Sequence, residues 1–268
     1  MNWRGVFLCV VGVASFAPIA AAEEKREKRA LIEEFLTAEP SCVQLKGEIE
    51  FSSAFDYRKP AGSWGVPVLI EYGITDRIEA EVEASYLSVR GNGSRNRGPG
   101  DVELGLHYAL RPDVDKVAVT LGADVGLATG DEAKGLGSGQ SDVEFFGIAG
   151  MKLGRAELHV TGRLEVEEEE VQPAMNAAAV YPHGDLRFTL EANVLSSAER
   201  TGERIVGQEA AEEPDDARGS EALWVVVTPG LFHRPRPEIE YGIGVPIGLT
   251  KAAPDWGIIA RLTIEFEF

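Results

Sequence analysis

Along most of the chain, apolar and polar residues alternate with a period of two, the pattern of a β-strand with one apolar face. In one clear segment Ile78, Val82 and Tyr86 alternate with glutamates. The closing segment is equally regular, and its apolar positions are Trp256, Ile258, Ala260, Leu262, Ile264, Phe266 and Phe268. The pattern predicts twelve strands, at about 43–57, 64–73, 78–89, 101–110, 116–127, 141–153, 156–166, 175–182, 185–195, 221–232, 238–248 and 256–268. Because the eighth shows little alternation, ten and fourteen strands are also compatible with the sequence.

The connections between these segments alternate in length. Short ones are at 74–77, 111–115, 154–155, 183–184 and 233–237, whereas long polar ones are at 57–63, 90–100, 128–140, 167–174, 195–220 and 249–255. Outer-membrane barrels have short periplasmic turns and long external loops, and a β-sandwich gives no reason for such alternation. We therefore expect an all-β fold, a transmembrane antiparallel up-and-down barrel over residues 43–268, with both termini periplasmic.

The aromatic residues of the apolar face fall into two groups by strand end. Near the long loops lie Tyr57, Trp64, Tyr86, Phe145, Trp224 and Trp256, and near the short turns lie Tyr72, Tyr108, Tyr181, Phe188, Phe232, Tyr241, Phe266 and Phe268. Amphipathic rings favour the two membrane–water interfaces. The distribution predicts one aromatic belt at each rim of the barrel.

Composition is compatible with this fold. Hydrophobic residues make up 44% and the mean hydropathy is −0.09, which a membrane barrel tolerates because only alternate strand residues need be apolar. The formal charge of −18 argues against nucleic acid as a partner. The expected partners are outer-membrane lipid, the barrel-assembly machinery and a small-molecule solute.

The N-terminus has the features of a secretory signal peptide. Arg4 precedes an apolar run at 6–17, and Ala20-Ala21-Ala22 forms a small-residue cleavage site before Glu23. We predict a signal peptide at 1–22 with cleavage between Ala22 and Glu23. Cys42 is then the sole cysteine of the mature chain, so no intramolecular disulfide is expected. We place Cys42 at the edge of the first strand, and a reactive thiol is the alternative.

Residues 23–42 differ from the rest of the chain. A charge run at 23–29 precedes Leu31, Ile32, Phe35 and Leu36, which fall at helical spacing. This pattern predicts a charged periplasmic segment that contains a short amphipathic helix ending near Pro40. The alternative is a plug that enters the mouth of the barrel.

Several motifs resemble those of a known family. They are Tyr72-Gly-Ile-Thr-Asp-Arg-Ile-Glu-Ala80, the segments 98–108 and 129–142, and Ala253-Pro-Asp-Trp256. The body of the chain, about 45–268, resembles the outer-membrane family named for the meta-pathway of phenol degradation, which is placed near the hydrocarbon-uptake barrels. The resemblance implies a transporter-like barrel, and the phenol label reflects gene neighbourhood in some members. The acidic insert at 196–220 departs from the family pattern.

The chain end carries a second resemblance. A terminal Phe268 behind an alternating strand is similar to the C-terminal signature of outer-membrane barrels, which the barrel-assembly machinery recognises. Phe266 and Phe268 are accordingly the expected assembly signal.

If the apolar face meets lipid, the polar face lines the interior. The candidate lumen-lining residues are Glu79, Glu81, Glu83, Glu103, Arg163, Arg187, Glu191 and Arg261. An excess of carboxylates favours cations over anions. The alternative is a network of salt bridges that stiffens a narrow or closed barrel, because twelve strands lie between filled and open barrels.

These features predict a passive outer-membrane transporter for small molecules, including aromatic or hydrophobic ones. The rivals are a structural barrel that displays the 196–220 loop and, from another class, an outer-membrane hydrolase. We expect no enzyme, because no serine–histidine pair reaches the external rim. No catalytic residue, cofactor or metal is expected.

Overall fold

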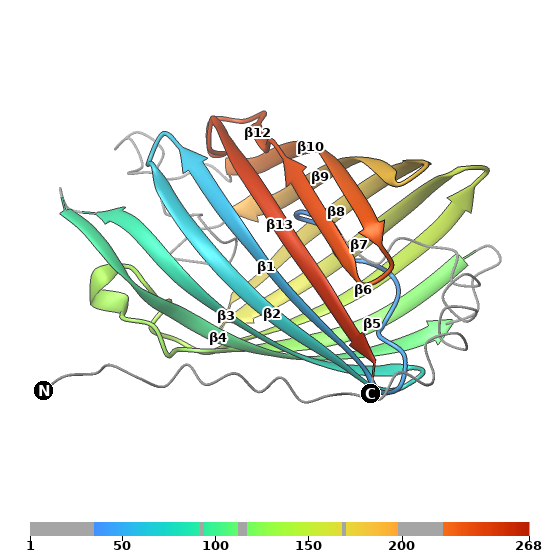
Figure 1. The fold of residues 1–268 in the computed structure, drawn as a ribbon. Coiled ribbons are helices and arrows are strands. Elements are labelled where there is room, and N and C mark those ends of the chain that lie inside the picture. The colour runs from blue at the N-terminus through green and yellow to red at the C-terminus, as the bar shows by residue number, and fades with distance from the viewer. Residues whose placement is uncertain (1–34, 92–93, 112–116, 168–169, 198–221, 268) are drawn as a thin grey trace, which may run out of the picture.

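The chain forms a closed antiparallel β-barrel (Figure 1). The computed structural model describes residues 35–91, 94–111, 117–167, 170–197 and 222–267. Neighbouring strands in the sheet follow sequence order, and pairing of the first strand with the last closes the wall. The strands are β1 (Glu48–Lys59), β2 (Ser63–Thr75), β3 (Ile78–Gly91), β4 (Ser94–Arg111), β5 (Val117–Leu127), β6 (Asp142–Leu153), β7 (Ala156–Glu167), β8 (Glu170–His183), β9 (Leu186–Ser197), β10 (Ala222–Arg236), β11 (Ile239–Gly244), β12 (Ile247–Gly248) and β13 (Trp256–Glu267).

The barrel has twelve strand positions, as the sequence predicted. β11 and β12 are successive pieces of one position, because each pairs with β10 on one side and β13 on the other. Closure leaves no open strand edge. The backbone N–H and C=O groups of such an edge would find no hydrogen-bond partner in the membrane. One short 3-10 helix, η1 (Glu132–Lys134), lies in the loop between β5 and β6. Among the described residues no helix is both long and apolar enough to cross a membrane.

Large apolar side chains cover the outside of the barrel. Along β4, for example, Leu104, Leu106, Tyr108 and Leu110 are exposed, while His107 between them is buried. Most of the predicted belt aromatics are among the exposed residues: Tyr72, Tyr86, Phe145, Tyr108, Tyr181, Phe188, Tyr241, Trp256 and Phe266. Exposed apolar surface of this extent would be unfavourable in water and suits contact with lipid.

Two belt predictions, for Trp224 and Phe232, are wrong. Both side chains are buried, at 2% and 1% exposure, on the inner face of β10. Trp224 packs on Val226 and Ala253, and Phe232 packs between Leu36 and Ile259. Because β10 is apolar on both faces, its alternation alone could not decide which face is inward.

Some predicted loops are strands. β3 and β4 continue as a ladder to Gly91 and Ser94, so most of the expected loop at 90–100 is paired, and β8 begins at Glu170 within the expected loop at 167–174. Cross-strand hydrogen bonding extends these hairpins through polar residues, which carry no membrane pattern. The alternation of loop lengths is therefore weaker than the sequence suggested.

The first strand begins at Glu48 and not at residue 43. Leu45 N–H donates to Glu48 Oε2 at 2.6 Å, and Gly47 has a φ of 85°, so the backbone turns before β1. The predicted N-terminal helix is not seen at 35–40, which forms bends, and its earlier residues lie outside the described part, as do the signal peptide and the Ala22–Glu23 cleavage site.

Candidate functional site

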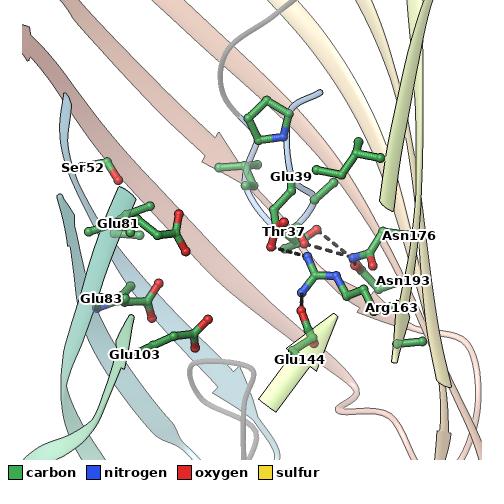
Figure 2. A pocket seen from close by; sticks show the side chains of 18 of the residues that line it. Thr37, Glu39, Ser52, Glu81, Glu83, Glu103, Glu144, Arg163, Asn176 and Asn193 are labelled. Carbon is green, nitrogen blue, oxygen red and sulfur yellow. Dashed lines mark hydrogen bonds and ion pairs between the residues drawn. The ribbon is translucent and has the colours of Figure 1, made fainter. Parts of the chain in front are cut away.

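A cavity of about 280 Å³ lies inside the barrel, and we call it the lumen cavity (Figure 2). Its lining comes from strands on opposite sides of the barrel and from residues 36–42 of the N-terminal segment. The carboxylates that line it outnumber the arginines Arg58, Arg163 and Arg261, and they are Glu39, Asp56, Glu71, Glu79, Glu81, Glu83, Glu103, Glu144 and Glu165. The cavity therefore presents a predominantly negative surface.

The structure places the sequence-predicted residues in two groups. Those that line the lumen cavity are Glu79, Glu81, Glu83, Glu103, Arg163 and Arg261. Glu191 and Arg187 are not in its lining. Glu191 is fully buried on β9 and binds the N-terminal segment, and Arg187 forms an ion pair with Glu240 of β11.

Seven carboxylates form a row of directly paired positions across the wall, which we call the acidic row. It follows cross-strand partners from β13 to β7 through Gly105 of β4, and its members are Glu265, Glu50, Glu71, Glu81, Asp124, Glu144 and Glu165. Barrel strands tilt by about 35–45°, so a row perpendicular to the strands climbs along the barrel axis. Glu265 is near the end of β13 and Glu165 near the end of β7, so the row runs from one rim toward the other.

Gly105 brings two members of the row close together. A Cβ at this position would lie 2.3 Å from Glu81 Cγ and 2.6 Å from Asp124 Oδ1. Any larger residue would push one of these carboxylates away. The glycine thus permits a concentration of negative charge that ordinary strand packing would separate.

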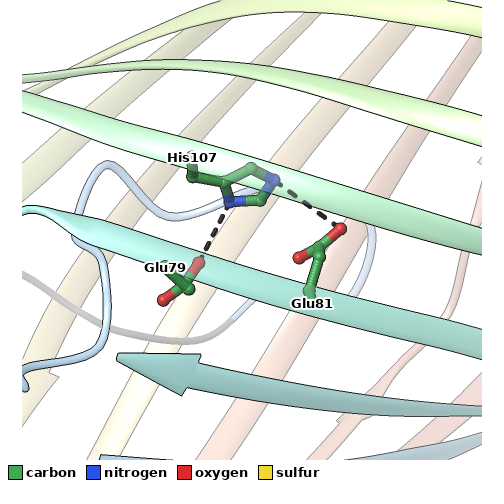
Figure 3. A group of neighbouring side chains, drawn as sticks. All are labelled: Glu79, Glu81 and His107. Carbon is green, nitrogen blue, oxygen red and sulfur yellow. Dashed lines mark hydrogen bonds and ion pairs between the residues drawn. The ribbon is translucent and has the colours of Figure 1, made fainter. Parts of the chain in front are cut away.

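His107 contacts carboxylates at this point (Figure 3). Its Nδ1 is 3.0 Å from Glu79 Oε1, and its Nε2 is 3.2 Å from Asp124 Oδ1 and 3.6 Å from Glu81 Oε1. The Phe146 ring meets the imidazole edge-on, with 4.8 Å between centroids. Only the doubly protonated imidazolium can donate from both nitrogens, so the arrangement suits a cationic His107.

The same carboxylates have the geometry of a cation-binding cluster. One ligand atom each from Glu79, Glu81 and His107 lie within 4.8 Å of one another, and so do those from Glu81, Glu103 and Asp124. In the first group His107 is already hydrogen-bonded to Glu79, so two of its three members interact with each other.

Across the cavity, Arg163 of β7 joins the barrel wall to the N-terminal segment (Figure 2). Its Nη1 donates to Glu144 Oε1 at 3.2 Å, and its Nη2 pairs with Glu39. Glu81, Glu83 and Glu103 line the opposite side of the cavity (Figure 2).

Residues 35–44 form part of the site, whereas the sequence pattern predicted a periplasmic segment. These residues lie inside the barrel, and Cys42, expected at a strand edge, lines the lumen cavity. The mixed composition of the segment does not predict a position inside the barrel. A plug that enters the barrel mouth was the alternative to a periplasmic helix. Phe266 is exposed on the outer face, and Phe268 lies outside the described residues.

No family model matches the chain, and the comparison with curated proteins gives no match. Solved structures do match. The COG4313 outer membrane channel from Pseudomonas putida F1 has a TM-score of 0.65 at 12% identity, over 86% of this chain and 98% of that one. The NanC porin has a TM-score of 0.54 at 11% identity, over 81% of this chain and 100% of its own. The KdgM porin has a TM-score of 0.53 at 7% identity, over 82% and 99%. These likenesses establish the fold.

Proposed function

We propose that the protein is a passive outer-membrane channel for small molecules, with a preference for cations over anions. The observation that carries the proposal is the lumen cavity, which is enclosed by a barrel with an apolar exterior and lined mainly by carboxylates. Fixed charge of one sign in a narrow passage attracts ions of the other sign and repels those of its own. The similar structures are a channel and two porins, which supports the same class of function.

The place of the protein in the cell is part of this proposal. We infer an outer-membrane location, with the short turns and both termini on the periplasmic side. The resemblance of the motifs at 72–80 and 98–108 supports membership of the phenol-degradation family and, with it, aromatic or hydrophobic solutes.

A structural barrel is the second candidate, and specific contacts favour it. Arg163 pairs with Glu144 and Glu39, and Arg187 pairs with Glu240, so part of the interior charge is neutralised by ion pairs inside the barrel. Such pairs stiffen a barrel without a transported solute.

Conductance in planar bilayers separates the two candidates. A channel gives discrete current steps, and under a KCl gradient its reversal potential moves toward the potassium equilibrium potential. Folded protein, identified by its heat-modifiable mobility in electrophoresis, is required for a valid comparison. If that protein gives neither current nor solute-dependent swelling of liposomes, the structural candidate is correct and the channel proposal is wrong.

A further inference from the structure

Residues 35–44 cross the interior of the barrel and bind its wall at several separate places. The bonds join the segment in chain order to β13, β9, β7, β5 and β3, through Arg261, Glu191, Arg163, Thr120 and Glu79. Arg261 Nη1 donates to Phe35 O at 2.8 Å, and Thr120 Oγ1 donates to Ser41 O at 2.9 Å. The segment is therefore held at both of its ends and spans the lumen between them.

Glu191 makes the densest of these contacts. Its Oε1 accepts from Leu36 N–H at 3.1 Å, and its Oε2 accepts from Thr37 N–H at 2.6 Å, Thr37 Oγ1 at 2.8 Å and Ala38 N–H at 2.9 Å. The residue has 0% exposure. Hydrogen bonds to an ionised acceptor are stronger than neutral ones, and here one carboxylate fixes three successive backbone amides.

The wall is shaped to admit the segment. Phe35 has 0% exposure and packs on Ala178 and Val180, with the His159 ring edge-on at 4.8 Å between centroids. A Cβ at Gly244 would lie 2.3 Å from Leu36 Cδ1, and one at Gly73 would lie 2.7 Å from Gln44 O, the carbonyl at the end of the segment. The second contact is with backbone, so any side chain at Gly73 would force the segment to move.

The placed segment forms one side of the lumen cavity. Thr37, Ala38, Glu39, Pro40 and Cys42 line it, opposite the glutamates of β3 and β4 (Figure 2). Any solute that passes through the cavity must pass between these two surfaces. The width left open therefore depends on where residues 35–44 are held.

We propose that residues 35–44 form a fixed constriction of the channel, and that Glu191 is the residue that positions it. This inference rests on the proposed channel function. Glu191 acts through the segment and is not in the lining of the cavity, so it determines the size of the passage and not its charge. Loss of the Glu191 carboxylate should therefore widen the passage without changing its charge selectivity.

The test compares Glu191→Gln with Glu240→Gln in the purified, folded full-length mature protein. Glu191→Gln places an amide N–H₂ against backbone donors, so we expect a several-fold larger single-channel conductance and faster reaction of Cys42 with an impermeant methanethiosulfonate. Glu240→Gln removes another buried carboxylate, which pairs with Arg187, and should leave both measurements as in the wild type. Cys42→Ser identifies the labelled thiol.

A second variant acts on the segment alone. Thr37→Pro removes the Thr37 N–H and Oγ1 that bind Glu191 while leaving every strand of the wall intact, and it should reproduce both changes. If the two folded variants keep wild-type conductance and a wild-type Cys42 labelling rate, the proposal is overturned. If no protein conducts, the channel function fails, and the Cys42 rate still decides whether Glu191 positions the segment.

Discussion

Glu83 of β3 and Glu103 of β4 are direct cross-strand partners, and both side chains line the lumen cavity. Like charges at directly opposite positions of a sheet repel each other and are destabilising. The pair is the most direct place to alter the charge of the cavity.

Neutralising Glu103 should reduce cation preference. For Glu103→Gln we expect the reversal potential under a KCl gradient to move toward zero, because the glutamine no longer repels anions. The variant also removes the cross-strand repulsion between Glu103 and Glu83. Asp131→Asn is the matched control, because Asp131 lies in the exposed β5–β6 loop. Equal shifts for the two variants would show that selectivity does not originate in the cavity.

The two faces of β13 should respond differently to charge. Leu262→Lys introduces an ammonium on the lipid-facing side, near the middle of the strand, and should lower the free energy of unfolding by about 2–4 kcal/mol. Thr263→Lys should cost less, because Thr263 faces a small interior pocket that it shares with Glu50, Glu240 and Glu265. Urea unfolding of the refolded barrels measures both values. Similar losses for the two variants would mean that the assigned facing of β13 is wrong.

Cysteine labelling on intact cells can determine which end of the barrel faces the cell exterior. In a Cys42→Ser background, Ala133→Cys should react with an impermeant thiol reagent, because Ala133 is exposed in a long loop. Asp185→Cys, in the short turn between β8 and β9, should be protected until the cells are opened. Labelling of the second position only would reverse the orientation.

Phe268 should matter for assembly. Phe268→Ala should lower the amount of heat-modifiable folded protein in the outer membrane, because the resemblance identifies the terminal aromatic as the assembly signal. Phe266→Ala, two residues earlier on the outer face, should have a milder effect. Immunoblots of unheated membrane fractions measure both. Wild-type levels of folded Phe268→Ala would remove the basis for this assignment.

The fold was largely predictable because strand alternation is a local property. Each of the twelve predicted segments overlaps an observed strand position, and the inward direction of Glu79, Glu81 and Arg163 follows from the period of two. The prediction failed where that signal is missing. β10 is apolar on both faces, so the inward placement of Trp224 and Phe232 depended on what they pack against, namely Ala253, Leu36 and Ile259.

By itself, the sequence determined that this chain forms an antiparallel barrel with an apolar exterior and a mainly acidic interior. Both properties follow from which residues occupy alternate positions along each strand. Neither depends on the pairing or register of the strands. Only the tertiary structure decided the register that aligns Glu50, Glu71 and Glu81 in the acidic row, because register depends on hydrogen bonds between strands. It also decided that residues 35–44 lie across the lumen. The carboxylate of Glu191 binds that segment although the two are more than 150 residues apart in the sequence. A contact between such distant residues produces no periodic pattern in the sequence of either segment.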